Sequence, residues 1–255
     1  MSIRNAIAIV NAKGGTYKTA ICSDLAVQFQ RDGKKVLVVD LDVQAHQTLA
    51  LGYDGDADDG ADFMKWMLEG TLIHREKAIR INVGGRVGLD VLEGGYLLAD
   101  DRWLQTWLIR EQEADIGLLE TRLEEISSEY DVILLDFPPY IAALTARMGL
   151  QAANIIISPL DGGIQSRDGV ELTERILEVL TERGAIKADG YILTNVGTLS
   201  LRTKKARDQI EETYGLAYLG KVRNVAITAE ACIERGLSVQ ELLEMKDKPD
   251  IGNPW

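Results

Sequence analysis

Near its N-terminus the chain reads Lys13-Gly14-Gly15-Thr16-Tyr17-Lys18-Thr19. A short apolar run, Ala6–Val10, precedes this stretch, and Lys18–Arg31 follows with Ile21, Leu25 and Phe29 spaced four apart on one helix face. A strand, a glycine-rich loop and a helix in this order bind phosphate, because loop N–H groups and the positive helix N-terminus attract phosphate oxygens. The stretch therefore predicts a P-loop rather than a plain glycine-rich turn.

The P-loop assigns expected tasks to its residues. Lys18 can reach the β- and γ-phosphates of a nucleotide, and the Thr19 hydroxyl can ligate Mg²⁺. The expected nucleotide-binding positions of the loop are Gly14, Gly15, Thr16, Tyr17, Lys18, Thr19 and Ala20.

The rest of the chain alternates between apolar runs and helical patterns. Strands are predicted at Lys35–Asp40, Leu89–Leu92, Val132–Asp136, Ile155–Pro159 and Tyr191–Asn195. Helices are predicted at Ile116–Ser127, Ile141–Gln151, Arg167–Arg183, Thr203–Tyr214 and Thr228–Arg235. Such alternation predicts an α/β fold, a doubly wound and mostly parallel sheet flanked by helices.

Composition narrows the class of protein. With 255 residues, 46% of them hydrophobic, we expect one domain over residues 1–255 with an irregular tail from about residue 246. No uncharged apolar run reaches the roughly 18 residues of a membrane span. Cys22 and Cys232 show no metal-ligand spacing, which favours a cytoplasmic protein with reduced thiols. The net charge of -12 means that binding to nucleic acid would require a local basic patch.

Two acidic segments end predicted strands. The first reads Asp40-Leu41-Asp42-Val43-Gln44, and the second, after four apolar residues, reads Asp136-Phe137-Pro138-Pro139. Carboxylates at the carboxyl ends of parallel strands face the ligand crevice of such a sheet. Taken alone, Asp40 and Asp42 would more often be a helix N-cap or an exposed loop acid, and a buried strand ending in the second segment could be merely structural.

In this order, the three segments resemble those of the ParA/MinD family of deviant Walker A ATPases. The family patterns are Lys-Gly-Gly-x-x-Lys-Thr, Asp-x-Asp-Pro-Gln, and an apolar strand followed by Asp-x-Pro-Pro. The resemblance implies an ATP-sandwich homodimer in which Lys13 reaches the partner's nucleotide. It also implies that Asp42 orients the attacking water, and that Asp40 and Asp136 lie on the magnesium side with Thr19.

The resemblance covers nearly the whole chain and is weakest from about Tyr53 to Ser128. Asn195 ends a strand where family members often contact adenine, and Arg223-Asn224-Val225 with Glu230-Ala231 is similar to a family stretch. The expected catalytic residues are thus Lys13, Lys18 and Asp42.

Tyr17 is the main departure from the family pattern, because most relatives have glycine there. If the position needs a positive φ, a tyrosine costs about 1 kcal/mol or more. We expect ATP binding with slow turnover, while normal turnover and poor nucleotide binding stay open. Val43 replaces the usual proline, and His46, a lone histidine, is more often structural than catalytic.

Basic residues cluster in the C-terminal half of this acidic chain. The candidate DNA-binding residues are Arg202, Lys204, Lys205, Arg207, Lys221 and Arg223. Such side chains can hold DNA through its phosphates without reading sequence, although a solvated basic helix face is the alternative. Pro249 and Pro254, within mixed charge, argue against a C-terminal amphipathic helix for a membrane.

The sequence therefore predicts a ParA-like switch that uses ATP and Mg²⁺ to dimerise, bind non-specific DNA and partition DNA or position cargo. A partner protein, ParB-like or a cargo adaptor, would stimulate hydrolysis, and the protein would be cytoplasmic and nucleoid-associated, not membrane-bound. Two alternatives remain: a degenerate nucleotide-binding scaffold with negligible hydrolysis, and a positioning ATPase for a cargo other than DNA.

Overall fold

The computed structural model describes residues 3–53, 59–99, 117–139, 144–161, 188–196, 215–223 and 234–246, and seven single positions between residues 172 and 213. Within these residues, no helix combines the length and the apolar character that crossing a membrane requires.

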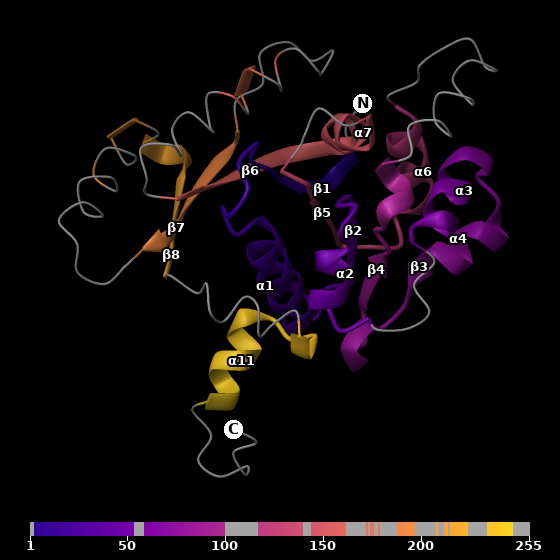
Figure 1. Cartoon of the computed structure of the whole chain (residues 1–255), viewed down its shortest axis with the longest axis horizontal. Helices are drawn as coiled ribbons and strands as arrows, with labels where there is room; N and C mark the ends of the chain where they lie inside the picture. Colours follow the sequence, from indigo (N-terminus) through magenta and orange to yellow (C-terminus); the bar gives the residue numbers. More distant parts are fainter. Residues whose placement is uncertain are drawn as a thin grey trace.

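One eight-stranded sheet organises the described chain (Figure 1). The strands are β1 (Ile3–Ile9), β2 (Val36–Asp40), β3 (Ile79–Arg80), β4 (Leu89–Leu92), β5 (Val132–Asp136), β6 (Ala153–Asp161), β7 (Gly190–Val196) and β8 (Tyr218–Arg223). Their order is β3-β4-β2-β5-β1-β6-β7-β8, and every neighbouring pair is parallel except β3 with β4.

The strand order places a ligand crevice beside β1. After β1 the chain builds β2 to β5 on one side of that strand, then continues with β6 to β8 on the other side. In open α/β sheets, ligands bind outside the carboxyl ends of the strands at such a switch of direction. The loop after β1 is the stretch that the sequence identified as a P-loop.

Helices cover both faces of the sheet. The described helices are α1 (Lys18–Arg31), α2 (His46–Ala50), α3 (Ala61–Glu69), α4 (Leu72–Ala78), α6 (Leu118–Ser127), α7 (Leu144–Ala152) and α11 (Val239–Lys246), with 3₁₀ turns η1 (Val83–Gly85), η2 (Tyr96–Ala99) and η3 (Gly215–Ala217). Figure 1 shows α1 and α11 together, and α3, α4 and α6 together on another side of the molecule.

Alternation along β2 explains the two faces. Leu37 and Val39 belong to the core cluster that contains α3, α6 and α7, whereas Val36 and Val38 belong to the cluster with α1. Successive side chains of a strand point to opposite faces, so an all-apolar strand requires cover on both. This confirms the predicted doubly wound fold.

The predicted elements agree with the structure where both are defined. The helix Lys18–Arg31 and the strand Val132–Asp136 have the predicted bounds, α6 lies inside its predicted range, and α7 extends one residue beyond its predicted end at Gln151. The predicted helices Arg167–Arg183, Thr203–Tyr214 and Thr228–Arg235 fall mostly outside the described residues. The sequence did not predict α11, and residues 247–255 of the expected tail also lie outside them.

Candidate nucleotide site

A cavity of about 650 Å³ lies at the carboxyl end of β1. Its lining comes mainly from residues 14–20 of the P-loop, the acidic segment after β2, residues 137–139 after β5, and Ser238 with Val239 at the start of α11. The size suits a nucleotide, since small-molecule sites are usually clefts of about 300–1,000 Å³. Three segments far apart in the sequence thus meet where the resemblance placed them, together with a fourth that it did not indicate.

The P-loop backbone takes the shape that a phosphate cradle requires. Gly15 has a φ of 73°, and Tyr17 has φ 64° and ψ 26°, the left-handed region that favours glycine. The condition under which a tyrosine at position 17 is strained is therefore met. Tyr17 therefore adopts a left-handed conformation without being a glycine, and it lines the cavity.

Asn11 anchors the loop to the sheet. Its buried side chain accepts a hydrogen bond from the Lys13 backbone N–H at 2.8 Å and donates one to the Pro159 carbonyl in β6 at 2.7 Å. Sequence analysis missed this residue, although a polar side chain at the end of an apolar strand was a visible sign.

The ammonium of Lys18 stays within the loop. Its Nζ donates to the Lys13 carbonyl at 3.1 Å. Burial lowers the pKa of Lys18, while the nearby carboxylates of Asp136 and Asp42 oppose that change. A phosphate entering the loop would give this buried ammonium a stronger partner than a neutral carbonyl.

The expected magnesium ligands Thr19 and Asp136 lie together. The Thr19 hydroxyl donates to Asp136 Oδ2 at 2.8 Å, which leaves Oδ1 of this buried carboxyl without a hydrogen-bond partner among the described residues. Burial, and then the charge of Asp40, raises the pKa of Asp136 to about 8. A buried carboxyl oxygen beside a hydroxyl matches the oxygen ligands that Mg²⁺ prefers, so these residues fit the ion.

Asp40 lies next to Asp136 across the pairing of β2 with β5, but its oxygens are already engaged. Oδ2 accepts hydrogen bonds from the Thr48 backbone N–H at 2.9 Å and from its hydroxyl at 2.8 Å, and Oδ1 accepts the Asp42 N–H at 3.1 Å. Burial raises the pKa of Asp40 to about 6 despite these bonds. Its direct contacts thus fix the acidic segment and α2.

The segment after β4 supports the acidic segment from the other side. The Gly94 N–H donates to the Thr48 hydroxyl at 3.3 Å. A Cβ on Gly94 would lie 2.7 Å from Asp40 Cγ and 2.9 Å from the Asp42 carbonyl oxygen, so this position has no room for a side chain.

Asp42, to which the resemblance assigns the orientation of the attacking water, follows β2. It lines the cavity, and its Oδ1 accepts the Gln44 backbone N–H at 3.0 Å. His46 also lines the cavity and is exposed. Lys13, in contrast, is not among the cavity-lining residues, and its carbonyl, not its ammonium, holds Lys18.

The other predicted site residues fall largely outside the described part of the chain. Asn195 lies in β7, with its side chain outside the described atoms. Lys221 is exposed on β8, which Arg223 ends. The other four candidate DNA-binding residues, Arg202, Lys204, Lys205 and Arg207, lie outside the described residues.

Comparison with known proteins agrees with this geometry. A family model described as an AAA domain matches residues 4–188. Cell division protein PomZ of Myxococcus xanthus is 30% identical over 203 residues, which are 79% of this chain and 60% of PomZ, so the chain spans less than two thirds of that protein. Chromosome-partitioning ATPase Soj of Treponema pallidum is 29% identical over 231 residues, covering 87% of this chain and 81% of Soj.

A solved ATP complex of McdA from Cyanothece matches with a TM-score of 0.76 and 17% identity, covering 95% of this chain and 91% of McdA. At that identity the likeness shows the fold alone. With its P-loop and both carboxylate segments around one cavity, the chain belongs to the AAA domain family, and among that family it is ParA-like, with PomZ and Soj as relatives.

Proposed function

We propose that this protein binds Mg-ATP in the cavity after β1, dimerises around the nucleotide and hydrolyses it slowly. The dimer binds DNA without sequence preference, and a ParB-like partner or cargo adaptor stimulates hydrolysis and release. The observation that carries the nucleotide part is the buried Asp136 carboxyl. Its Oδ2 accepts the Thr19 hydroxyl, its Oδ1 has no hydrogen-bond partner among the described residues, and its charge influences Lys18. The names of Soj and PomZ support a role in partition or division.

The chain's own residues suit phosphoryl transfer to water. Bound Mg²⁺ would neutralise charge on the β- and γ-phosphate oxygens, with Thr19 and Asp136 as its protein ligands. Lys18 would leave the Lys13 carbonyl for the phosphate, and Asp42 would orient the attacking water. Lys13 would act on the partner's nucleotide and stabilise the charge that develops during transfer.

Nucleotide-dependent association tests the switch directly. Light scattering with ATP, ADP and no nucleotide should show a dimer with ATP only, and duplex DNA should bind only to that dimer. Asp42→Ala should bind ATP and stay dimeric, because the variant loses the group that orients water. Loss of ATP binding in Asp42→Ala would contradict the role proposed for this carboxylate.

Charge reversal tests the DNA surface. Glutamate at Arg202, Lys205 and Arg223 should abolish DNA retention and leave ATP affinity unchanged, because phosphate contacts dominate non-specific binding. A matched triple reversal at the exposed residues Lys34, Lys65 and Lys77 makes the same change in net charge elsewhere. Equal loss in both triple variants would mean that total charge, not this surface, controls retention.

The conformation of Tyr17 favours a second candidate, a nucleotide-dependent scaffold with negligible hydrolysis. Tyr17 places a bulky side chain in the P-loop at a left-handed backbone position, and it lines the cavity. Phosphate release with and without the partner protein separates the two candidates, because the scaffold would dimerise with ATP but show no partner-dependent turnover.

A further inference from the structure

The segment Gly236–Lys246 forms one wall of the nucleotide cavity. It comprises the approach to α11 and the helix itself, and its residues Ser238 and Val239 line the cavity. Val239 and Leu242 are buried and pack with Leu237 and Ala20. Because Ala20 is in the first turn of the helix that follows the P-loop, the wall contacts the phosphate-binding element directly.

The start of α11 is fixed by a capping box. The Ser238 backbone N–H donates to Glu241 Oε2 at 2.8 Å, and the Glu241 N–H donates to Ser238 Oγ at 3.3 Å. From α1, Asp24 Oδ1 accepts the Gln240 N–H at 3.2 Å. The backbone of the wall is thus positioned by Glu241 and by Asp24.

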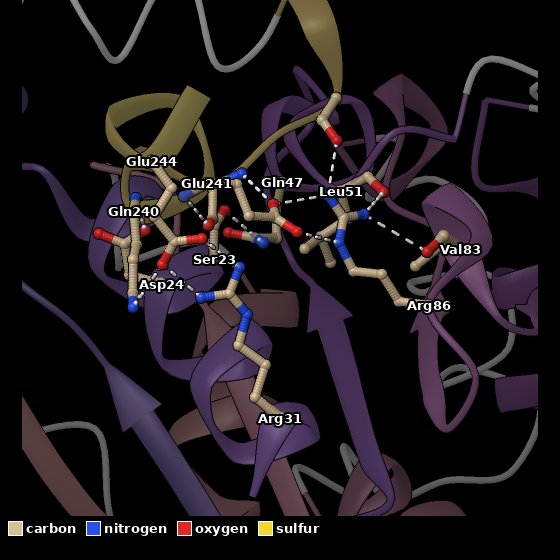
Figure 2. Close-up of polar contacts among 12 residues, drawn as sticks. Ser23, Asp24, Arg31, Gln47, Leu51, Val83, Arg86, Gln240, Glu241 and Glu244 are labelled. Carbon is tan, nitrogen blue, oxygen red and sulfur yellow. Dashed lines mark hydrogen bonds and ion pairs between the residues drawn. The ribbon is translucent and has the colours of Figure 1, made fainter. Parts of the chain in front are cut away.

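Arg86 connects this segment to the rest of the site (Figure 2). Its Nε and Nη2 donate to the two Glu241 carboxylate oxygens at 2.9 and 2.8 Å, and Nη2 also donates to the Gly236 carbonyl at 2.9 Å. Nη1 donates to the carbonyls of Leu51 at 2.9 Å and Val83 at 3.4 Å. A guanidinium has five N–H donors in a fixed plane, and here this 8% exposed side chain makes five bonds.

The hydrogen bond from Arg86 to the Leu51 carbonyl connects Arg86 to the acidic segment. Leu51 directly follows α2, the helix whose Thr48 holds Asp40 with two hydrogen bonds. Gln47 of the same helix donates from Nε2 to Ser23 Oγ of α1 at 3.0 Å. Arg86 therefore links the α2 unit, which supports the carboxylates, to the α11 wall across the cavity.

Two glycines make this close contact possible. Gly52 and Gly236 have φ values of 81° and 62°, and a Cβ on Gly236 would lie 2.2 Å from the Gly52 Cα. The approach of the C-terminal segment to the end of α2 is therefore backbone to backbone, and it is independent of the charge pair.

We propose that Arg86 is a positioning residue of the nucleotide site, which latches Gly236–Lys246 to the end of α2 and so sets the wall formed by Ser238 and Val239. Nucleotide binding and docking of this segment then stabilise each other, because linkage between two sites is reciprocal. The inference goes beyond the proposed switch, since it requires nucleotide binding but neither hydrolysis, dimerisation nor DNA.

A second ion pair to α11 provides a control for the Arg86 variants. Arg31 of α1 makes a bidentate pair with Glu244 at 2.8 and 2.9 Å, but the two side chains are 34% and 49% exposed (Figure 2). Neither residue lines the cavity. Arg31→Ala therefore removes one ion pair of α11 and none of the hydrogen bonds that Arg86 makes.

The test compares Arg86→Ala and Arg86→Lys with Arg31→Ala in the full chain. Mg-ADP affinity is measured by fluorescence with a labelled ADP, and docking by hydrogen exchange of residues 236–246 with and without Mg-ADP. In the wild type, Mg-ADP should slow exchange in this segment. Both Arg86 variants should bind at least about tenfold more weakly and lose the slowing, because one ammonium cannot reproduce the planar donor set.

Arg31→Ala should keep its affinity within about twofold and keep the nucleotide-dependent slowing. Arg86 variants that exchange rapidly at 236–246 yet bind Mg-ADP like the wild type would overturn the inference alone. A wild type that binds neither Mg-ATP nor Mg-ADP would refute both the proposed function and this inference.

A steric variant covers the case in which Arg86 variants do not fold. Gly236→Ala places a methyl group against Gly52, whereas Gly33→Ala, at a φ of 78° with no atom within 4 Å of the added Cβ, carries similar backbone strain without a clash. Weaker Mg-ADP binding in Gly236→Ala only is the expected result. Equal affinity in the two variants would overturn the proposal.

Discussion

Tyr17 offers a way to measure strain and side-chain obstruction separately in one P-loop. Its φ of 64° and ψ of 26° place it in the left-handed region, and it lines the cavity. Tyr17→Ala removes the ring and keeps the backbone strain, whereas Tyr17→Gly removes both. The difference between the two variants therefore reports the strain, and the difference between the wild type and Tyr17→Ala reports the ring.

The expected strain follows from the dihedral angles. A left-handed conformation costs an L-residue about 1–2 kcal/mol, and glycine avoids this cost. Glycine loses about 0.5–1 kcal/mol through its extra freedom in the unfolded chain. Tyr17→Gly should therefore be about 0.5–1 kcal/mol more stable than Tyr17→Ala, which is roughly 1–4 °C in Tm for a domain of this size.

Urea unfolding without nucleotide or Mg²⁺ measures this difference. Ala45→Gly is the matched control, because Ala45 also has left-handed angles, φ 51° and ψ 28°, and is not in the P-loop. It should gain stability of similar size relative to the wild type. If Tyr17→Gly were less stable than Tyr17→Ala while Ala45→Gly was stabilised, the strain argument at position 17 would be refuted.

The same variants would locate the cause of the slow turnover that we propose. Since the backbone already has the cradle conformation with tyrosine, ATP affinity in Tyr17→Gly should change by no more than about fivefold, or about 1 kcal/mol. Faster phosphate release in both variants would identify the ring as the cause, and faster release in Tyr17→Gly only would identify the strain. A large loss of ATP affinity in both would instead mean that the ring contributes to binding.

Three further changes probe the carboxylates. The pKa of Asp136 is raised from 3.8 to about 8, so between these pH values the folded protein keeps a proton that the unfolded chain loses. Without Mg²⁺, the free energy of unfolding should therefore fall as pH rises from about 4 to 8. Asp136→Asn should reduce this fall, measured as urea midpoints in the presence of a chelator. Thr48→Val removes the hydroxyl bound to Asp40 and should destabilise by about 1–3 kcal/mol, whereas an unchanged midpoint would mean that water replaces the bond. Gly94→Ala places a methyl group against Asp40 and Asp42, so it should lower the free energy of unfolding by about 1–3 kcal/mol and abolish phosphate release. Wild-type turnover in this variant would show that the segment after β4 can shift to accommodate the methyl group.

Local motifs explain why the cavity could be predicted from the sequence. The P-loop carries its strand, its glycines and its helix within one short stretch, and Asp136 follows a run of apolar residues that can only be a buried strand. Each of these groups gets its position from neighbours in the sequence. Their meeting at one end of the sheet then follows from parallel pairing.

Long-range contacts explain what could not be predicted. Arg86, Glu241 and Leu51 show no sequence pattern that relates them, because they meet only after β2, β4 and α11 have packed. The Ser-x-x-Glu spacing of the α11 capping box was a visible sign of a helix, but nothing local indicated where that helix docks. Asp40 lies beside Asp136, and the sequence did not show that Thr48 of α2 would hold it with two hydrogen bonds.

The short strand β3 has a consequence for how copies of this protein meet. It holds only the two residues Ile79 and Arg80, runs against its neighbour β4, and Arg80 is paired with Glu93. A long exposed edge strand offers unpaired backbone N–H and C=O groups to a second chain and promotes aggregation, whereas a short edge strand with a charged residue discourages it. On this side the folded molecule is thus protected against uncontrolled strand-to-strand association.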